Sequence, residues 1–280
     1  MSAGVVLVTG CSSGIGRASA SAFQDAGWTT YATARNPATL TALEAAGVFA
    51  LRLDVIDETS MQQAVSAIEA RHGAVDVLVN NAGYALQAPI ETADMAQVRR
   101  QFDTNVFGLV RLTQLVLPAM RAQRSGRIVN VSSMAGRLTF PGGGFYHATK
   151  HAVEAISDAL RLETAPFGIR ISVVQPGPVL TDFGTTAVST IAEDGSRSSE
   201  PYDDFMRRVA VAYAGAYDEK RRTLASSPEA VARVILRAAT ARRPRTRYVV
   251  GPLARTLLAS RRVLPDRAFD ALVKAGYPTP

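Results

Sequence analysis

Seven short apolar runs, each followed by a longer stretch with helical spacing, constrain the fold of this chain more than any other feature. The runs occupy residues 5–9, 29–33, 49–53, 75–80, 127–131, 169–175 and 248–250. The helical segments between them span residues 15–26, 38–46, 60–72, 95–124, 146–165 and 228–239. The runs are continuously apolar, as expected when both faces of a sheet are covered. This alternation predicts a doubly wound α/β domain, with a parallel sheet of about seven strands and helices on both faces.

Size and composition favour a single domain that spans residues 1–280. The apolar fraction of 47% is ample for a packed core, and no repeat, low-complexity stretch or linker divides the chain. The single cysteine, Cys11, cannot form an internal disulfide, so nothing demands an oxidising compartment. The first residues lack the basic region of a secretory leader, and no apolar run reaches the roughly 20 residues that cross a bilayer. We expect a cytoplasmic protein without an integral membrane segment.

The formal net charge of +7 is concentrated near the C-terminus, where residues 197–280 hold 17 basic and 8 acidic side chains. A basic region of this kind can attract phosphate, anionic lipid or nucleic acid. Its arginines are scattered, however, and no DNA-reading motif accompanies them. We therefore expect a solvated surface and no nucleic-acid partner.

Two segments depart from the alternation of strands and helices. Residues 181–227 follow a late strand, where such sheets bind ligands, and predict a lid over the substrate; a helix that simply packs on the core is the alternative. The amphipathic spacing in this insertion involves Tyr202, Phe205, Met206, Val209 and Tyr213. Residues 252–280 predict a C-terminal helical cap. Its alternative is a membrane-surface helix, because leucines at 253, 257 and 258 lie beside arginines.

A glycine-rich loop follows the first apolar run. Gly10, Gly14 and Gly16 open the first helical segment. Glycine permits a tight turn and lets backbone N–H groups approach a pyrophosphate, which a helix N-terminus attracts. The spacing is G-x-x-x-G-x-G and not G-x-G-x-x-G, although the physical reasoning is shared. The loop favours a dinucleotide site, with a plain glycine turn as the alternative.

The same loop also matches G-x-S-x-G, the nucleophile elbow of serine hydrolases. An elbow is normally reached after several strands, whereas this loop follows the first. The histidines, at positions 72, 147 and 151, are not placed at the end of a late strand, where a triad base would lie. Hydrolysis is therefore disfavoured.

The end of the second apolar run indicates which dinucleotide is preferred. An acidic residue there would accept hydrogen bonds from the ribose hydroxyls and repel a 2′-phosphate. None is present, and Arg35 supplies a planar cation suited to phosphate. We predict NADP(H) in preference to NAD(H). An exposed loop arginine without this role is the alternative.

Tyr146 and Lys150 form the candidate reacting pair. They lie four residues apart, on one face of a helix. A free tyrosine has a pKa of about 10, and a nearby ammonium ion lowers that pKa toward the working pH of a proton-transfer group. Ser133, just after the fifth run, is placed to hold a substrate oxygen. Each feature alone is compatible with ordinary structure, but together with the glycine loop they indicate hydride chemistry on a carbonyl or alcohol.

Taken together, these residues resemble the short-chain dehydrogenase/reductase family over nearly the whole chain. The matching motifs are Thr9-Gly10 to Gly16, Asp54, Asn80-Asn81-Ala82-Gly83, Asn105, Ser132-Ser133, Tyr146 with Lys150, and Pro176-Gly177 to Thr181. The resemblance implies a Rossmann-type fold and an NADP-dependent oxidoreductase. It is greatest to the branch with 17β-hydroxysteroid and retinol dehydrogenases, which implies an apolar ketone, aldehyde or secondary alcohol as substrate.

The resemblance also implies a role for each matching residue. Tyr146 would be the general acid or base, and Ser133 would polarise the reacting oxygen. Lys150 would bind the nicotinamide ribose and lower the tyrosine pKa, while Asn105 would anchor a water in the proton relay. The implied cofactor-binding residues are Gly10, Ser12, Ser13, Gly14, Ile15, Gly16, Arg35, Asp54, Val55, Asn81, Gly83, Tyr146, Lys150, Pro176, Gly177, Val179 and Thr181.

Further expectations concern the substrate and the partners. The candidate pocket residues are Leu86, Met134, Phe140, Phe145 and Phe183, together with the apolar face of the predicted lid. The family implies a homodimer or homotetramer built on the helices at 95–124 and 146–165. His147 and His151 have a spacing that can hold a metal, but no third ligand is evident, and we predict no metal. A regulator that binds NADPH without turnover is the alternative function; intact Asn105, Ser133, Tyr146 and Lys150 argue against it.

Overall fold

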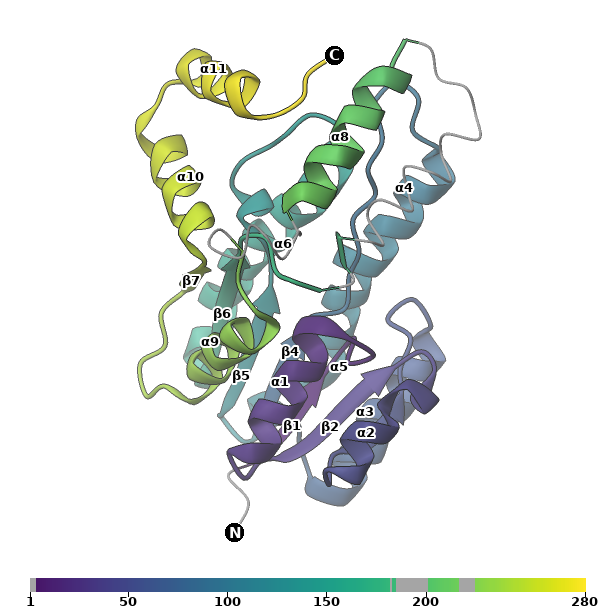
Figure 1. The fold of residues 1–280 in the computed structure, drawn as a ribbon. Coiled ribbons are helices and arrows are strands. Elements are labelled where there is room, and N and C mark those ends of the chain that lie inside the picture. The colour runs from purple at the N-terminus through teal and green to yellow at the C-terminus, as the bar shows by residue number, and fades with distance from the viewer. Residues whose placement is uncertain (1–3, 182, 185–200, 217–224) are drawn as a thin grey trace.

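Seven strands within the described residues pair in parallel to form one sheet (Figure 1). The structure is a computed structural model that describes residues 4–181, 183–184, 201–216 and 225–280. The strands are β1 (Val5–Val8), β2 (Thr29–Ala34), β3 (Phe49–Arg52), β4 (Val77–Asn80), β5 (Gly126–Val131), β6 (Ile169–Pro176) and β7 (Arg247–Val250). Their order across the sheet is β3-β2-β1-β4-β5-β6-β7. The predicted doubly wound α/β class is confirmed, and the chain order reverses between β1 and β4.

Helices cover both faces of the sheet (Figure 1). The α-helices within the described residues are α1 (Gly14–Asp25), α2 (Thr41–Ala45), α3 (Glu58–His72), α4 (Met95–Phe102), α5 (Gly108–Ala122), α6 (Gly144–Thr164), α8 (Asp203–Ala216), α9 (Pro228–Thr240), α10 (Pro252–Val263) and α11 (Asp266–Gly276). Among them, none has the length and apolar character needed to cross a membrane.

The core consists of two apolar layers, one on each face. Val6 and Val8 of β1 pack on the side covered by α1 and α9. Val5 and Leu7 point to the other side, where α3 and α5 pack. All four β1 residues are buried, which explains why the run is continuously apolar instead of alternating.

The segment 95–124 is not the single helix that its sequence predicts. α4 ends at Phe102, and a π-helical turn, η2 (Asp103–Phe107), separates it from α5. The buried Asn105 lies in this turn and binds the backbone of Tyr84. A long-range contact therefore sets the local backbone, as is typical of π-turns near functional sites.

The described parts of the two departing segments lie above the carboxyl edge of the sheet (Figure 1). Of the predicted lid, residues 182, 185–200 and 217–224 lie outside the described residues, while α8 is described. Its apolar face buries Phe205, Met206 and Val209, with Tyr277 packed against them. Residues 252–276 contain α10 and α11. A lid function stays a prediction.

Candidate active site

A cavity of about 1220 Å³ lies at the carboxyl edge of the sheet. Ligand pockets for one drug-sized molecule usually measure about 300–1,000 Å³, so this one has room for a cofactor and a substrate. Parallel α/β sheets bind ligands at this edge, where the strand order reverses. The cavity extends from the loop after β1, past the start of α6, to the C-terminal helices.

The glycine loop forms one end of the cavity. Gly10 has a φ of +70°, a conformation that side chains rarely adopt. Gly16 is buried beneath the loop, where an added Cβ would collide with the carbonyl oxygen of Gly10. Asn81 holds the loop from β4, since its Nδ2 donates to the carbonyl oxygens of Thr9 at 2.9 Å and Gly10 at 3.2 Å. The loop is thus closed tightly over the start of α1.

The N-terminus of α1 is suited to an anion. Ser13, the residue before the helix, makes no side-chain capping hydrogen bond. The first N–H groups of a helix have no intrahelical partners, and they attract phosphate. Ser12, Ser13, Gly14 and Ile15 line the cavity at this point. The tight loop and the uncapped helix together fit the pyrophosphate of a nicotinamide dinucleotide.

The end of the cavity beside β2 carries two arginines. Arg35 is exposed at the end of β2 and lines the cavity, as does Arg100 of α4. Burial raises the pKa of Tyr84, and the cations of Arg100 and Arg35 oppose that rise, so both lie near this side chain. Asp54, Val55, Asn81 and Gly83 line the same region. Arg100 escaped the sequence reasoning because it follows no motif.

The candidate reacting residues meet at the start of α6. Tyr146 and Lys150 are 7% and 6% exposed, and both line the cavity. The Nζ atom of Lys150 donates to the carbonyl oxygen of Val131 at 3.0 Å and lies 5.9 Å from the centre of the Tyr146 ring. Burial lowers the pKa of this amine to about 8, while the charge of Glu154 raises it. The ammonium ion and the phenol therefore share one side of the cavity.

Ser133 lies between two strand ends. Its Oγ accepts a hydrogen bond from the N–H of Ala135 at 3.1 Å and donates to the carbonyl oxygen of Pro176 at 3.4 Å. These contacts join the loop after β5 to the end of β6. Ser133 lines the cavity, together with Pro176, Gly177, Val179 and Thr181.

Asn105 and Gly16 are the two predicted site residues that do not line the cavity. Asn105 is buried behind Gly83, where an added Cβ would lie 2.9 Å from Asn105 Oδ1 and 3.7 Å from Lys150 Nζ. Its Oδ1 accepts from the N–H of Tyr84 at 3.1 Å, and its Nδ2 donates to the Tyr84 carbonyl at 2.8 Å and to Thr149 Oγ1 at 3.1 Å. The side chain thus braces the wall next to Lys150.

Comparison with known proteins agrees with this geometry. A family model described as short chain dehydrogenase matches residues 4–192, more than half of the chain. The chain belongs to this family. A 3-ketodihydrosphingosine reductase of Bacteroides thetaiotaomicron is 36% identical over 275 residues, which cover 98% of this dehydrogenase and 97% of the relative.

Two solved structures give the same fold with different cofactors. The closed form of a serine dehydrogenase complexed with NADP+ has a TM-score of 0.76 at 29% identity, over 89% of this dehydrogenase and 95% of that chain. A short-chain dehydrogenase/reductase from Burkholderia phymatum, in complex with NAD, has a TM-score of 0.80 at 25% identity. The match covers 100% of this dehydrogenase and 97% of that chain. Family membership is confirmed. The narrower branch stays a resemblance.

The end of the cavity away from the glycine loop has an apolar wall. Leu86, Met134, Phe140 and Phe183 line the cavity as predicted. Phe145 was a wrong prediction: it is half-buried, but it is not one of the lining residues. It directly precedes Tyr146 on α6, so its side chain points in a different direction around the helix.

The segment after β7 supplies much of this wall, which sequence reasoning did not foresee, whereas a contribution from the apolar face that contains α8 was predicted. The lining residues from α8 and from the C-terminal segment are Ala212, Tyr213, Leu253, Leu257, Leu272, Val273, Gly276 and Tyr277. Leu253 and Leu257 are four residues apart and so lie on one helix face, which is the sequence signal that could have indicated a shared apolar contact. The sequence left open that the leucine face of this helix binds a membrane surface. In the structure, Leu253 and Leu257 line the cavity.

His147 also lines the apolar wall. Its Nδ1 hydrogen-bonds the carbonyl oxygen of Leu138 at 2.7 Å, and its ring meets that of Phe140 edge-on at 5.8 Å. Burial lowers the pKa of His147 to about 4, so the ring is neutral at physiological pH. Within the described ranges, no three histidine, cysteine or carboxylate side chains cluster as a metal site.

Proposed function

We propose that this dehydrogenase uses NADP(H) to interconvert a hydrophobic ketone or aldehyde and the corresponding alcohol, with Tyr146 as general acid and base. One observation carries the proposal. Tyr146, Lys150 and Ser133 line the same cavity as the glycine loop and Arg35. A proton-transfer group and a dinucleotide cradle in one cavity are what hydride exchange with a carbonyl requires.

In the reducing direction, the Ser133 and Tyr146 hydroxyls hold the substrate oxygen. When bound, the nicotinamide supplies the hydride to the carbonyl carbon. Tyr146 gives its proton to the oxygen as negative charge develops there, and the ammonium ion of Lys150 favours the phenolate that remains. In the oxidising direction, the phenolate takes the proton back. Phe183, 5.8 Å from the Tyr146 ring, helps to exclude water from this exchange.

The preference for NADP(H) rests on charge. Strand β2 ends without an acidic residue that would repel a 2′-phosphate, and Arg35 lies exposed there, on the cavity. Arg100 adds a second cation to the same region. A guanidinium group can bind a phosphate through two parallel hydrogen bonds.

The preference for a hydrophobic substrate rests on the wall that the C-terminal helices provide. Leu253, Leu257 and Val273 face the cavity from these helices. Apolar pockets with a few convergent polar groups select apolar ligands and orient their polar atoms. The relative from Bacteroides thetaiotaomicron is named as the reductase of a keto compound, which supports a ketone as substrate here.

A regulator that binds NADPH without turnover is not favoured, because the curated relative is named as a reductase. Two other features belong to the proposal. We propose a cytoplasmic location, because the single cysteine requires no oxidising compartment. We also propose a homodimer or homotetramer, which sedimentation equilibrium would distinguish from a monomer.

The test is an absorbance assay of NADPH consumption against a panel of apolar ketones and aldehydes. We expect turnover by the wild-type protein and a loss of roughly 100-fold or more in Tyr146→Phe, the usual contribution of a general acid. Fluorescence titration should show that this variant still binds NADPH. The matched control is Tyr31→Phe, which removes a hydroxyl bonded to His72; neither residue lines the cavity. Full activity in Tyr146→Phe, or no turnover of any carbonyl despite tight NADPH binding, would refute the proposal.

A further inference from the structure

Glu154 is a buried carboxylate one helical turn beyond Lys150. Residues four apart on a helix lie on the same face, and Glu154 is only 4% exposed. An added Cβ on Gly136 would lie 2.9 Å from Glu154 Cγ and 2.7 Å from Ser132 Oγ. The side chain therefore packs under the loop that carries Ser133.

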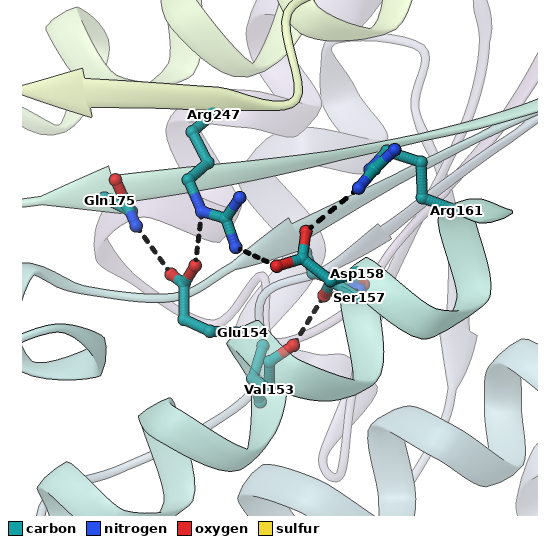
Figure 2. Close-up of polar contacts among 8 residues, drawn as sticks. Val153, Glu154, Ser157, Asp158, Arg161, Gln175 and Arg247 are labelled. Atoms are coloured by element: carbon teal, nitrogen blue, oxygen red, sulfur yellow. Dashed lines mark hydrogen bonds and ion pairs between the residues drawn. The ribbon is translucent and has the colours of Figure 1, made fainter.

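Two neighbouring strands lock this carboxylate in place, as Figure 2 shows. Gln175 of β6 donates from Nε2 to Glu154 Oε1 at 2.8 Å, and Arg247 of β7 donates from Nε to Oε2 at 2.9 Å. Arg247 also binds Asp158 at 2.7 Å, and Arg161 approaches Asp158 at 3.5 Å. Both oxygens of Glu154 are thus engaged, and Gln175 directly precedes Pro176 on the cavity.

Few charges surround the Lys150 amine. Burial lowers its pKa to about 8, and within the described chain Glu154 is the charged group that opposes this fall. Tyr146 faces the amine from the preceding turn of α6. From β7, the Arg247 cation binds the Glu154 carboxylate, while Asp158 is a further turn along α6 (Figure 2).

We propose that Glu154 is a positioning residue for the reaction, and that its locked carboxylate keeps the neighbouring Lys150 an ammonium ion beside Tyr146. A buried amine without a nearby anion releases its proton readily, because the interior solvates charge poorly. Glu154 touches neither the cavity nor the reacting atoms and acts through Lys150. The inference rests on the proposed function, since the role of Lys150 does.

The lysine content of the chain allows a direct test. Lysines occur at positions 150, 220 and 274 alone, so protein labelled with 13C-lysine gives three side-chain signals to follow by NMR as the pH is raised. The spectrum of Lys150→Met assigns the signal of Lys150. In the wild-type protein we expect Lys150 to titrate well below the ordinary value of about 10.4.

Glu154→Gln removes the charge and keeps the shape of the side chain. We expect the Lys150 titration to move down by about one pH unit, the lower end of the range for one close opposite charge. Asp158→Asn is the matched control: it removes a carboxylate of the same cluster, one turn farther from Lys150, and should leave the titration in place. An unchanged Lys150 titration in Glu154→Gln would overturn the inference.

A second variant covers the case in which Glu154→Gln does not fold. Glu154→Gln combined with Arg247→Gln removes both charges of the pair, and Asp158, which also loses Arg247, keeps its ion pair with Arg161. Lys150 should again titrate below its wild-type value, by less than in the single variant, because the repulsion from Arg247 is gone. A titration at or above the wild-type value would contradict the proposal.

The pH profile of carbonyl reduction gives the second readout. As the pH rises, kcat/KM should fall where Lys150 loses its proton, and this fall should begin about one pH unit lower in Glu154→Gln. A merely structural role would lower kcat/KM without moving the profile and would overturn the inference. If the wild-type protein reduces no carbonyl, the proposed function fails, while the NMR titration still decides the role of Glu154.

Discussion

The rings of Phe140 and Tyr277 stack with their centroids 5.0 Å apart and their planes inclined by 26°. Phe140 lies in the loop that precedes α6, and Tyr277 directly follows α11. Both residues line the cavity. This contact holds the C-terminal tail against the loop that leads to Tyr146.

The aromatic stack makes Tyr277 a determinant of substrate size. Tyr277→Ala removes a contact of about 0.5–1.5 kcal/mol and part of the apolar wall. We expect kcat/KM for bulky apolar carbonyls to fall roughly fivefold, while that for the smallest carbonyls hardly changes. Steady-state kinetics across a series of chain lengths would measure this. Tyr277→Phe keeps the ring and should behave as the wild type; an equal loss for all chain lengths would argue against the wall.

Gly16 tolerates no side chain. An added Cβ would collide with the carbonyl oxygen of Gly10 and lie 2.6 Å from Asn81 Nδ2, so Gly16→Ala must open the glycine loop. Overpacking of this kind costs about 1–3 kcal/mol, and we expect NADPH to bind roughly tenfold more weakly or worse. Fluorescence titration measures the affinity. Gly215→Ala in α8, where an added Cβ has nothing within 4 Å, should leave it unchanged.

Arg35→Asp should reverse the cofactor preference. The carboxylate would repel a 2′-phosphate and accept hydrogen bonds from ribose hydroxyls. We expect the ratio of NADPH to NADH affinity to fall by roughly 100-fold, a loss of about 3 kcal/mol for a charged hydrogen-bonded pair. Calorimetric titration with both cofactors gives the ratio. An unchanged preference for NADPH would show that Arg35 is only an exposed loop residue.

Lys150 should destabilise the folded protein at neutral pH. Because its folded pKa is about 8 and its ordinary value 10.5, the unfolded chain binds the proton more tightly. The resulting loss in the free energy of unfolding is fully present below about pH 8 and disappears as the pH rises toward 10.5. A pKa shift of this size destabilises the folded protein by about 3 kcal/mol. The hydrogen bond from Lys150 to Val131 offsets roughly 1 kcal/mol of that.

Lys150→Met should therefore raise the free energy of unfolding by about 2 kcal/mol at neutral pH. Urea denaturation of the cofactor-free protein at neutral and at alkaline pH measures this, and the gain should shrink at the higher pH. A variant less stable than the wild type at neutral pH, or a gain that grows with pH, would contradict the assignment.

The features of the fold and of the candidate site that depend on a local sequence pattern could be predicted from the sequence. Continuous apolar runs such as the one in β1 indicated strands buried on both faces. The spacing of Gly10, Gly14 and Gly16 indicated the cradle at α1, and the four-residue spacing of Tyr146 and Lys150 placed both on one helix face. Each signal lies within a few residues of the chain, where sequence reasoning is effective.

The remaining features depend on contacts between distant residues. The π-turn follows from the hydrogen bonds of Asn105 to Tyr84 and Thr149, which are 21 and 44 positions away. Glu154 meets Arg247 across 93 positions. The family resemblance had singled out Asn105 but not its partners, and no local pattern distinguishes Glu154 or Arg247, so only the folded chain brings these contacts to light.

Part of the apolar wall comes from a different part of the chain than the candidate proton-transfer groups. Ser133, Tyr146 and Lys150 precede β6, whereas Leu253, Leu257 and Tyr277 follow β7. Selectivity and reactivity can therefore diverge independently among descendants of one ancestor. If the proposed function holds, exchanging only the portion beyond β7 should change which carbonyl compounds the enzyme accepts and leave Ser133, Tyr146 and Lys150 in place.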